Sequence, residues 1–179
     1  NNNLNPEKVS NYEIATTYIT NKFELSLNSY LSLINNAISR EFSQINNQDS
    51  ILYDGEIMRV QMNKNIDNIT IYGFEIFIKS LFANNYTMDN KLIYTAGQKS
   101  NNDPLAHIAP IQIKNNFKKK IGNSYIVLSH TYSGKKDHED FDLSGIDNLD
   151  EATIDGIPSV NFFDISYFNQ INKNITVNF

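Results

Sequence analysis

The segment between residues 137 and 155 has the clearest capacity for chemistry in this sequence. Eight aspartate and glutamate side chains lie within it, a density of carboxylates that no other part of the chain reaches. Carboxylate oxygens are hard ligands, and Ca²⁺ is the common protein-bound cation that takes many of them. The segment is therefore a candidate calcium-binding loop.

Residues 140–151 resemble the twelve-residue loop of an EF-hand. Such a loop places oxygen ligands at positions one, three, five, seven, nine and twelve, with glycine at position six for the sharp turn. Gly145 stands at position six. The predicted calcium ligands occupy the other key positions: Asp140, Asp142, Ser144, Ile146, Asn148 and Glu151.

Two departures argue against a true EF-hand. Leu143 occupies position four, which is usually polar, and Asp147 replaces the aliphatic residue that locks paired loops together. Neither flank has the pattern of a helix. We therefore expect an isolated calcium-binding loop between strands, with a solvated acidic loop as the alternative.

Sequence signatures of catalysis are missing. The chain has no cysteine, which excludes disulfides, thiolate metal sites and a cysteine nucleophile. His107, His130 and His138 are too widely spaced for a local zinc motif, and the neighbours Ser129 and His130 would point to opposite faces of a strand. We predict that the protein is not an enzyme.

The charge balance argues against a nucleic-acid partner. The formal net charge is -5, and phosphate binding needs clustered cations. Arg40 and Arg59 are the only arginines. We interpret the lysine run at 118–120 as a solvated turn between strands.

A long helix is predicted in the N-terminal part of the chain, before the strands and the acidic loop. Asn5, Pro6 and Glu7 form a typical helix start. Apolar residues then follow at spacings of three and four from Ala15 to Ile45. We predict one amphipathic helix over about 6–46, roughly 60 Å long at about 1.5 Å per residue. The alternative is a break near residues 20–22, which would give an antiparallel helix pair.

From residue 51 the period changes to two, which predicts strands. The strongest strand is 68–82, with Gly73 as a bulge or close approach, and Gly122 and Asn123 turn the chain in a later hairpin. The other predicted strands are 51–62, 91–97, 108–114, 124–132, 160–167 and 175–179. The predicted fold is α+β: one domain over 1–179, with the long N-terminal amphipathic helix packed on an antiparallel β-sheet at about 51–179.

This layout resembles the soluble region of type IV pilins and type II secretion pseudopilins. The resemblance rests on the apolar stripe from Ala15 to Ile45, the strands from Ile51 to Tyr132, and the late acidic loop. It implies a non-enzymatic, extracytoplasmic assembly subunit, at the cell surface, secreted or periplasmic, and some pseudopilins hold calcium in a comparable loop. Its partners would be other subunits, bound through the N-terminal helix in a homo- or hetero-oligomer. The membrane would be reached only through a segment before Asn1.

The alternative function is an extracellular ligand-binding or sensor domain of a membrane receptor. A sheet can cup a small molecule, and Tyr72, Phe74, Tyr94 and Tyr125 are the aromatic residues that would line such a pocket. Ordinary packing within the sheet is the competing explanation for these four side chains. A capsid, toxin or appendage component would leave no motif, and it stays open as a third reading.

Calcium binding is testable by thermal unfolding. Binding to the folded state alone should stabilise it by about 2.7 kcal/mol at a hundredfold excess over the dissociation constant. We expect calcium to raise the unfolding midpoint and a chelator to lower it, with both effects lost in Asp142→Ala and Glu151→Ala. An unchanged midpoint in the unmodified protein would end the calcium hypothesis.

Overall fold

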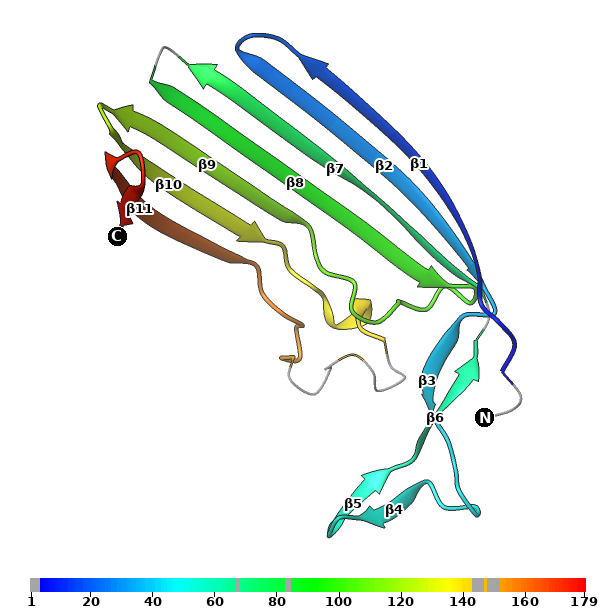
Figure 1. The fold of residues 1–179 in the computed structure, drawn as a ribbon. Helices are drawn as coiled ribbons and strands as arrows, with labels where there is room; N and C mark the ends of the chain where they lie inside the picture. Colours follow the sequence, from blue (N-terminus) through cyan, green and yellow to red (C-terminus); the bar gives the residue numbers. More distant parts are fainter. Residues whose placement is uncertain (1–3, 67, 83–84, 143–146, 148–151) are drawn as a thin grey trace.

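The computed structural model describes residues 4–66, 68–82, 85–142, 147 and 152–179, and these form strands almost throughout (Figure 1). The single short helix within them is the 3-10 turn His138–Asp140. No helix of the described part is long and apolar enough to cross a membrane. The strands are β1 Lys8–Ile19, β2 Phe23–Asn35, β3 Ile38–Phe42, β4 Ser50–Tyr53, β5 Glu56–Arg59, β6 Gln61–Asn65, β7 Ile69–Phe82, β8 Tyr86–Lys99, β9 Gln112–Ile121, β10 Ser124–Ser133, β11 Val160–Asn172 and β12 Ile175–Asn178.

The predicted helix over 6–46 is wrong, and with it the α+β fold class. Its residues form strands β1 and β2, which pair antiparallel along their whole length, followed by β3. Many of the apolar residues are spaced by four, as in Phe23, Leu27 and Leu31. Four is also an even number, so such residues share one face of a strand as well as one face of a helix. The spacing alone therefore fits both structures.

The predicted break near residues 20–22 exists, but it is the turn of a β-hairpin. The Thr20 backbone N–H donates to the Phe23 carbonyl at 2.7 Å. The Thr20 hydroxyl oxygen accepts the backbone N–H of Lys22 at 3.3 Å and that of Phe23 at 3.0 Å. A side-chain oxygen that satisfies local backbone donors is what makes threonine favourable in a turn.

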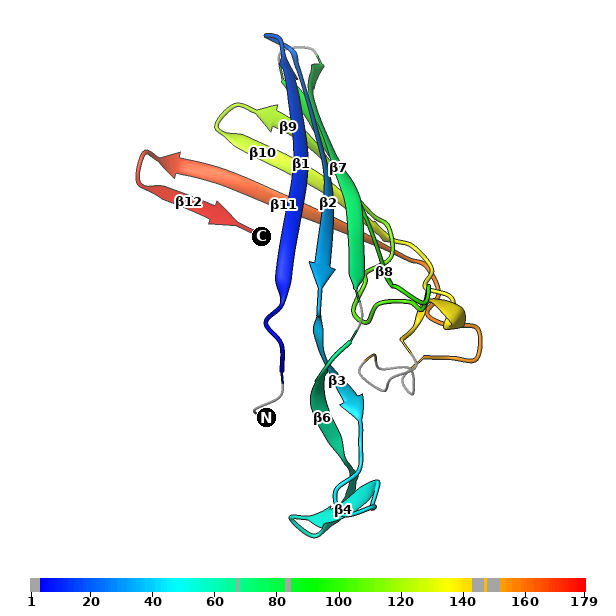
Figure 2. The same ribbon diagram turned by 90° about the vertical axis from the view of Figure 1, so that its right-hand side faces the viewer.

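Eight strands form one antiparallel sheet in the order β1-β2-β7-β8-β9-β10-β11-β12. Neighbours in this order are also neighbours along the chain, apart from an excursion between β2 and β7. The strands run side by side with a common tilt, and the sheet is curved (Figures 1 and 2). Such a meander of hairpins satisfies almost every backbone donor and acceptor within the sheet.

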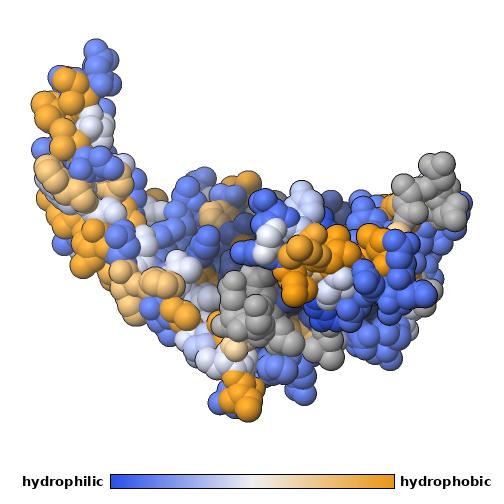
Figure 3. All heavy atoms as spheres, turned by 90° about the horizontal axis from the view of Figure 1, so that it is seen from below, coloured by the Kyte–Doolittle hydropathy of each residue, from blue (hydrophilic) through white to orange (hydrophobic). Residues whose placement is uncertain are grey.

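The two faces of the sheet differ sharply in chemistry. Residues that pair directly across the strands share a face, so the register assigns each side chain to one of two sides. The apolar face carries Ile14, Leu27, Leu31, Ile76, Ile78, Leu92, Phe117, Leu128 and Ile165. The polar face carries Glu13, Glu24, Glu75, Lys79, Asp89, Lys91, Lys114, Lys118 and Asp164. Figure 3 shows hydrophobic residues along the convex side of the curved sheet and hydrophilic residues towards its hollow side.

The sheet is not folded around a core of its own. Among the described residues only Ala37, Val60, Ile69 and Phe141 are buried apolar side chains, whereas Ile14 is 74% exposed and Ile165 is 71% exposed. Large apolar side chains exposed along a whole face mark a surface that meets another apolar phase. The sheet therefore needs an apolar surrounding on its convex side.

Gly73 marks the close approach that the sequence suggested. A side chain at this position would collide with the Tyr94 carbonyl oxygen and with the Tyr30 hydroxyl. The Tyr30 ring occupies that space, and its hydroxyl lies 2.7 Å from Thr95 Oγ1 on β8. The glycine thus allows an aromatic ring from β2 to cross over β7 and reach β8.

Several predicted strands are confirmed. Strands β7 and β10 match 68–82 and 124–132, and Gly122 and Asn123 turn the chain between β9 and β10 as expected. The prediction of a solvated turn at the lysine run 118–120 is wrong, since the run lies within β9. Lys118 and Lys120 lie on the polar face of this strand.

Candidate functional site

The two ends of the sheet are built differently. At one end, consecutive strands are separated by only a few residues, at 20–22, 83–85, 122–123 and 173–174. At the other end the connections are long, covering residues 36–68, 100–111 and 134–159. Figure 1 shows all three long connections below the sheet, on the same side as the N-terminus. Binding residues concentrate on long loops held by a rigid scaffold, so the long-loop end is the candidate site.

Loops 100–111 and 134–159 are joined by a cluster of buried charges, which we call the clasp and define as Lys99, Lys136, Asp142 and Asp147. Lys99 Nζ lies 2.8 Å from Asp142 Oδ2, and Lys136 Nζ lies 2.8 Å from Asp147 Oδ2. The exposed fraction is 3% for Asp142 and 8% for both Lys136 and Asp147. Buried charges persist only when they are paired and hydrogen-bonded, so each of these lysines needs its aspartate.

Backbone and ring contacts complete the clasp. The backbone N–H groups of Asp142 and His107 donate to the Asp147 carboxylate at 3.3 and 3.4 Å. Lys136 Nζ also lies 4.2 Å from the centre of the buried Phe141 ring, a cation–π distance. Asp147 therefore gathers donors from both loops around one carboxylate.

Loop 100–111 folds back over the end of β8, where a glycine makes room for it. A side chain at Gly97 would press against Ile108 Cδ1 at 2.9 Å and Leu105 Cδ2 at 3.0 Å. The Leu105 N–H donates to the Gly97 carbonyl at 3.3 Å, and the Gly134 N–H donates to the Ile111 carbonyl at 2.8 Å. A hollow of about 470 Å³ remains between these apolar side chains, the end of β8 and Lys136.

The pKa of Asp147 lies below its ordinary value. Burial raises the pKa of this carboxyl, but the hydrogen bond from Lys136, the backbone N–H groups and the lysine charge together lower it by more. The carboxylate is thus held in its ionised form by the partners that it organises.

The predicted calcium loop falls largely outside the described residues. Ser144, Ile146, Asn148 and Glu151 are not described, and among the described residues no three His, Asp or Glu side chains come together as a metal site. Asp140 caps the 3-10 turn by accepting the Asp137 N–H at 3.1 Å, and Asp142 is paired with Lys99. Calcium binding by residues 140–151 stays a prediction.

The long connection formed by residues 36–68 is an arm that projects beyond the sheet (Figures 1 and 2). Its strands pair as β3 with β6 and β4 with β5. At its base Asn65 Nδ2 donates to the carbonyls of Asn36 at 2.7 Å and Asn5 at 2.9 Å. The Glu7 carboxylate also accepts the Ile38 N–H at 2.6 Å. These bonds attach the base of the arm to the segment that precedes β1.

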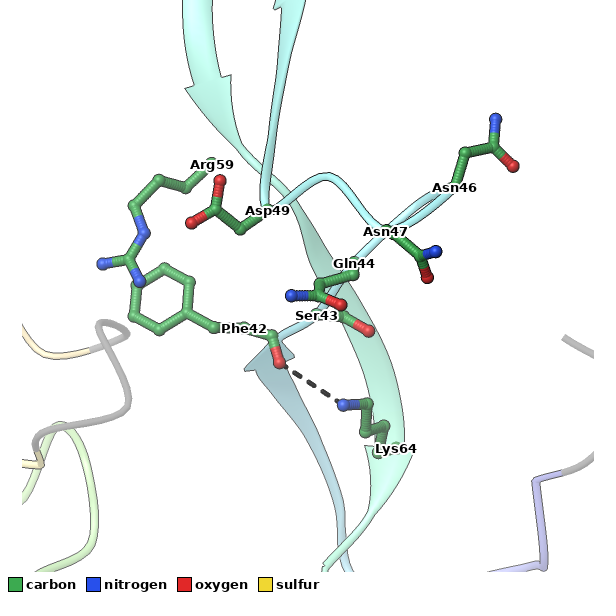
Figure 4. Close-up of a pocket in the computed structure, with 8 residues that line it drawn as sticks. All are labelled: Phe42, Ser43, Gln44, Asn46, Asn47, Asp49, Arg59 and Lys64. Carbon is green, nitrogen blue, oxygen red and sulfur yellow. Dashed lines mark hydrogen bonds between the residues drawn. The ribbon is translucent and has the colours of Figure 1, made fainter.

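A polar hollow of about 740 Å³ lies midway along the arm (Figure 4). The Arg59 guanidinium lies over the Phe42 ring, 3.7 Å from its centre. Lys64 Nζ donates to the Phe42 carbonyl at 3.3 Å. Asp49, which lies beside Arg59, and Asn47 also line the hollow. The hollow combines two cations, a carboxylate and amides, so it can bind a polar solute.

The comparison with protein families decides what kind of sheet this is. Residues 1–179 match the family model described as TonB dependent receptor-like, beta-barrel. The chain belongs to this family. No match was found among curated protein sequences.

Solved structures of a copper transporter and of siderophore receptors share the fold at low sequence identity. The copper transporter OprC superposes with a TM-score of 0.79 at 15% identity, over 99% of this chain and 25% of that one. The ferric enterobactin receptor PfeA of Pseudomonas aeruginosa gives 0.71 at 16%, over 99% and 26% of the two chains. The siderophore receptor PirA of Acinetobacter baumannii gives 0.69 at 18%, over 97% and 27%. This chain thus spans about a quarter of the length of these receptors.

Membership of the TonB-dependent receptor family overturns the pilin interpretation. The resemblance to pilins and pseudopilins, the role as a filament or secretion subunit, and the partners bound through an N-terminal helix are all wrong. The alternative, a membrane receptor that binds a ligand, agrees better with the family. An extracytoplasmic location is confirmed in the broad sense of the cell envelope, but a secreted or soluble periplasmic protein is not. A non-enzymatic role also accords with this family.

Sequence reasoning found one half of the clasp and missed the other. The acidic segment drew attention to Asp142 and Asp147, but Lys99 and Lys136 carried no local signal. The four aromatic residues of the predicted ligand pocket do not converge. Register places Tyr72, Phe74 and Tyr94 on the apolar face and Tyr125 on the polar face.

Replacement of Asp147 should open the clasp. In Asp147→Asn, Lys136 stays buried without its counter-charge, which costs about 3 kcal/mol when a buried pair is broken. Amide hydrogen exchange in loops 100–111 and 134–159 should therefore speed up, while that of the strands stays the same. Asp137→Asn is the matched control, because Asp137 pairs with Lys135 where both side chains are about half exposed. Equal exchange in the two variants would contradict this role of Asp147.

Acid should loosen the same loops. The pKa of Asp147 is lower in the folded protein than in the unfolded chain, so its contribution is fully present above about pH 4. That contribution is lost as the pH falls through the lower, folded value. Pepsin cleavage within residues 134–159 should become faster below about pH 4 in the unmodified protein. The increase should be smaller in Asp147→Asn, which has no carboxyl group to protonate at this position. Identical acid profiles for the two proteins would exclude Asp147 as the cause.

Proposed function

We propose that this chain forms part of the wall of an outer-membrane transporter that takes up metal ions or metal–chelator complexes. The observation that carries the proposal is the alternation of apolar and polar side chains, which is clearest along β2, β8 and β9. A transmembrane barrel needs this alternation, because one face meets lipid and the other faces the lumen. The copper and siderophore proteins that share the fold suggest the class of cargo.

The unequal lengths of the connections at the two ends of the sheet suggest how it is oriented across the outer membrane. Bacterial outer-membrane barrels have short turns on the periplasmic side and longer loops outside the cell. The turns near Thr20 and Gly122 would then face the periplasm. The clasp and the arm would face the medium, where they would be the first surfaces to meet an incoming solute.

Lipid contact is testable at neighbouring residues. Cysteines would be introduced singly in the complete receptor as Ile76→Cys, Phe77→Cys, Leu128→Cys and Ser129→Cys, labelled with a small fluorophore and placed in vesicles of brominated lipid. We expect strong quenching at 76 and 128, and little at 77 and 129, because register puts the members of each pair on opposite faces. Equal quenching within the pairs would refute the membrane-wall proposal.

Uptake is testable in cells. A strain without the receptor gene should accumulate less iron or copper in metal-poor medium, and the intact gene should restore the content, as measured by mass spectrometry of washed cells. A receptor without residues 43–59 should reach the outer membrane but restore uptake only in part, since it loses the distal arm. Full restoration by the shortened receptor would show that the arm is not needed for uptake. Unchanged metal content in the deletion strain would refute the proposal that the receptor takes up these metals.

A further inference from the structure

Lysines gather on one sector of the polar face. The described strands β7, β8 and β9 place five of them there, away from the clasp: Lys79, Lys91, Lys114, Lys118 and Lys120. The acidic side chains that share this sector are Glu75 and Asp89. On the same face β1 and β2 carry Glu13 and Glu24 instead. The polar wall is therefore basic around β9 and acidic around β1.

The register places like charges opposite one another in this sector. Lys91 and Lys114 are direct cross-strand partners, an arrangement in which like charges repel. Lys91 Nζ is 2.9 Å from Glu75 Oε2, so this carboxylate is already engaged. The sector thus has more positive charge than its own carboxylates balance.

A hollow of about 290 Å³ opens in the same sector, towards the short turns. Three of the lysines line it, Lys79, Lys118 and Lys120, together with Thr87 and Asp89 and the apolar and amide side chains of Leu81 and Asn85. The Lys120 N–H donates to the Asn85 carbonyl at 2.8 Å, which fixes Asn85, just before β8, against β9. Lys118 Nζ lies 3.7 Å from the centre of the Tyr125 ring.

The composition of this hollow defines the ligand that would fit. Three ammonium groups on flexible stems are point-charge donors suited to phosphate-like oxygens, and the Thr87 hydroxyl adds a neutral donor. Asp89 opposes an anion, and its buried Oδ1 has no hydrogen-bond partner among the described residues. With three lysines against one aspartate, a monovalent anion would leave positive charge in the hollow, whereas a multivalent one would neutralise it.

We propose that Lys79, Lys118 and Lys120 form a binding site for a multivalent oxyanion at the short-turn end of the polar wall. The proposal rests on the proposed function in one respect, since it takes this face to be the lumen side of the barrel. The site lies far from the clasp and the arm, so a solute held there has already passed the long-loop end. It is a second binding station, distinct from the loops.

Pyrophosphate is the probe that tests the site. Calorimetric titration of the complete receptor in detergent, at low ionic strength, should show saturable binding. Lys118→Gln with Lys120→Gln should weaken it at least tenfold. Lys8→Gln with Lys173→Gln is the matched control, because it removes the same charge from residues that do not line this hollow and should bind like the unmodified receptor. Asp89→Asn should bind several-fold more tightly, a gain that damage to the fold would not produce.

Each outcome bears on the site. No saturable binding, equal weakening in both double variants, or no gain in Asp89→Asn would overturn the proposal. Lys118→Arg with Lys120→Arg keeps the charge and should retain binding, which separates a charge effect from misfolding. If lipid quenching places residues 77 and 129 away from lipid but pyrophosphate does not bind, the oxyanion site fails and the membrane wall stands. If quenching places them in lipid, the membrane wall fails by itself.

Discussion

The constraint on which this structure depends is that a strand inside a bilayer must satisfy every backbone N–H and C=O group within the protein. Antiparallel pairing with a neighbour on each side does this, and β2, β7, β8, β9 and β10 all have two such neighbours. Once the ladder is fixed, side chains alternate strictly between two environments. The apolar face, the lysine-rich sector and the placement of long loops at one end all follow from that ladder.

Many of the strands could be predicted from the sequence, but those at the N-terminus could not. Strands around Phe74 and Val127 were predictable, because β-branched and aromatic residues alternate there between clear turn signals. The N-terminal hairpin was misjudged for a physical reason: Leu27 and Leu31 share a face in a helix and in a strand alike. Each strand of a membrane barrel is a weak signal by itself, and the evidence for it accumulates only when several are read together.

The candidate site was predictable only where its residues are neighbours in sequence. An acidic segment is visible at once, but the lysines that neutralise it come from the end of β8 and the beginning of a loop, and only the fold brings them together. A polar cluster on the apolar face was likewise not visible in the sequence. Asn115 Nδ2 donates to His130 Nδ1 at 3.1 Å, and His130 Nε2 donates to Asn161 Oδ1 at 2.9 Å. Three polar side chains from β9, β10 and β11 thus satisfy one another on the side where unpaired polar groups cost most.

The clasp has a consequence for how tightly the long-loop end can hold a solute. Ordering a flexible loop costs roughly 1 to 2 kcal/mol for each residue whose backbone becomes fixed, and binding must normally supply that free energy. Here the contacts of Asp147 and Lys136 fix parts of two loops before any solute arrives. Part of the entropic cost is therefore met during folding, and a ligand that bound these loops would have less of it to supply.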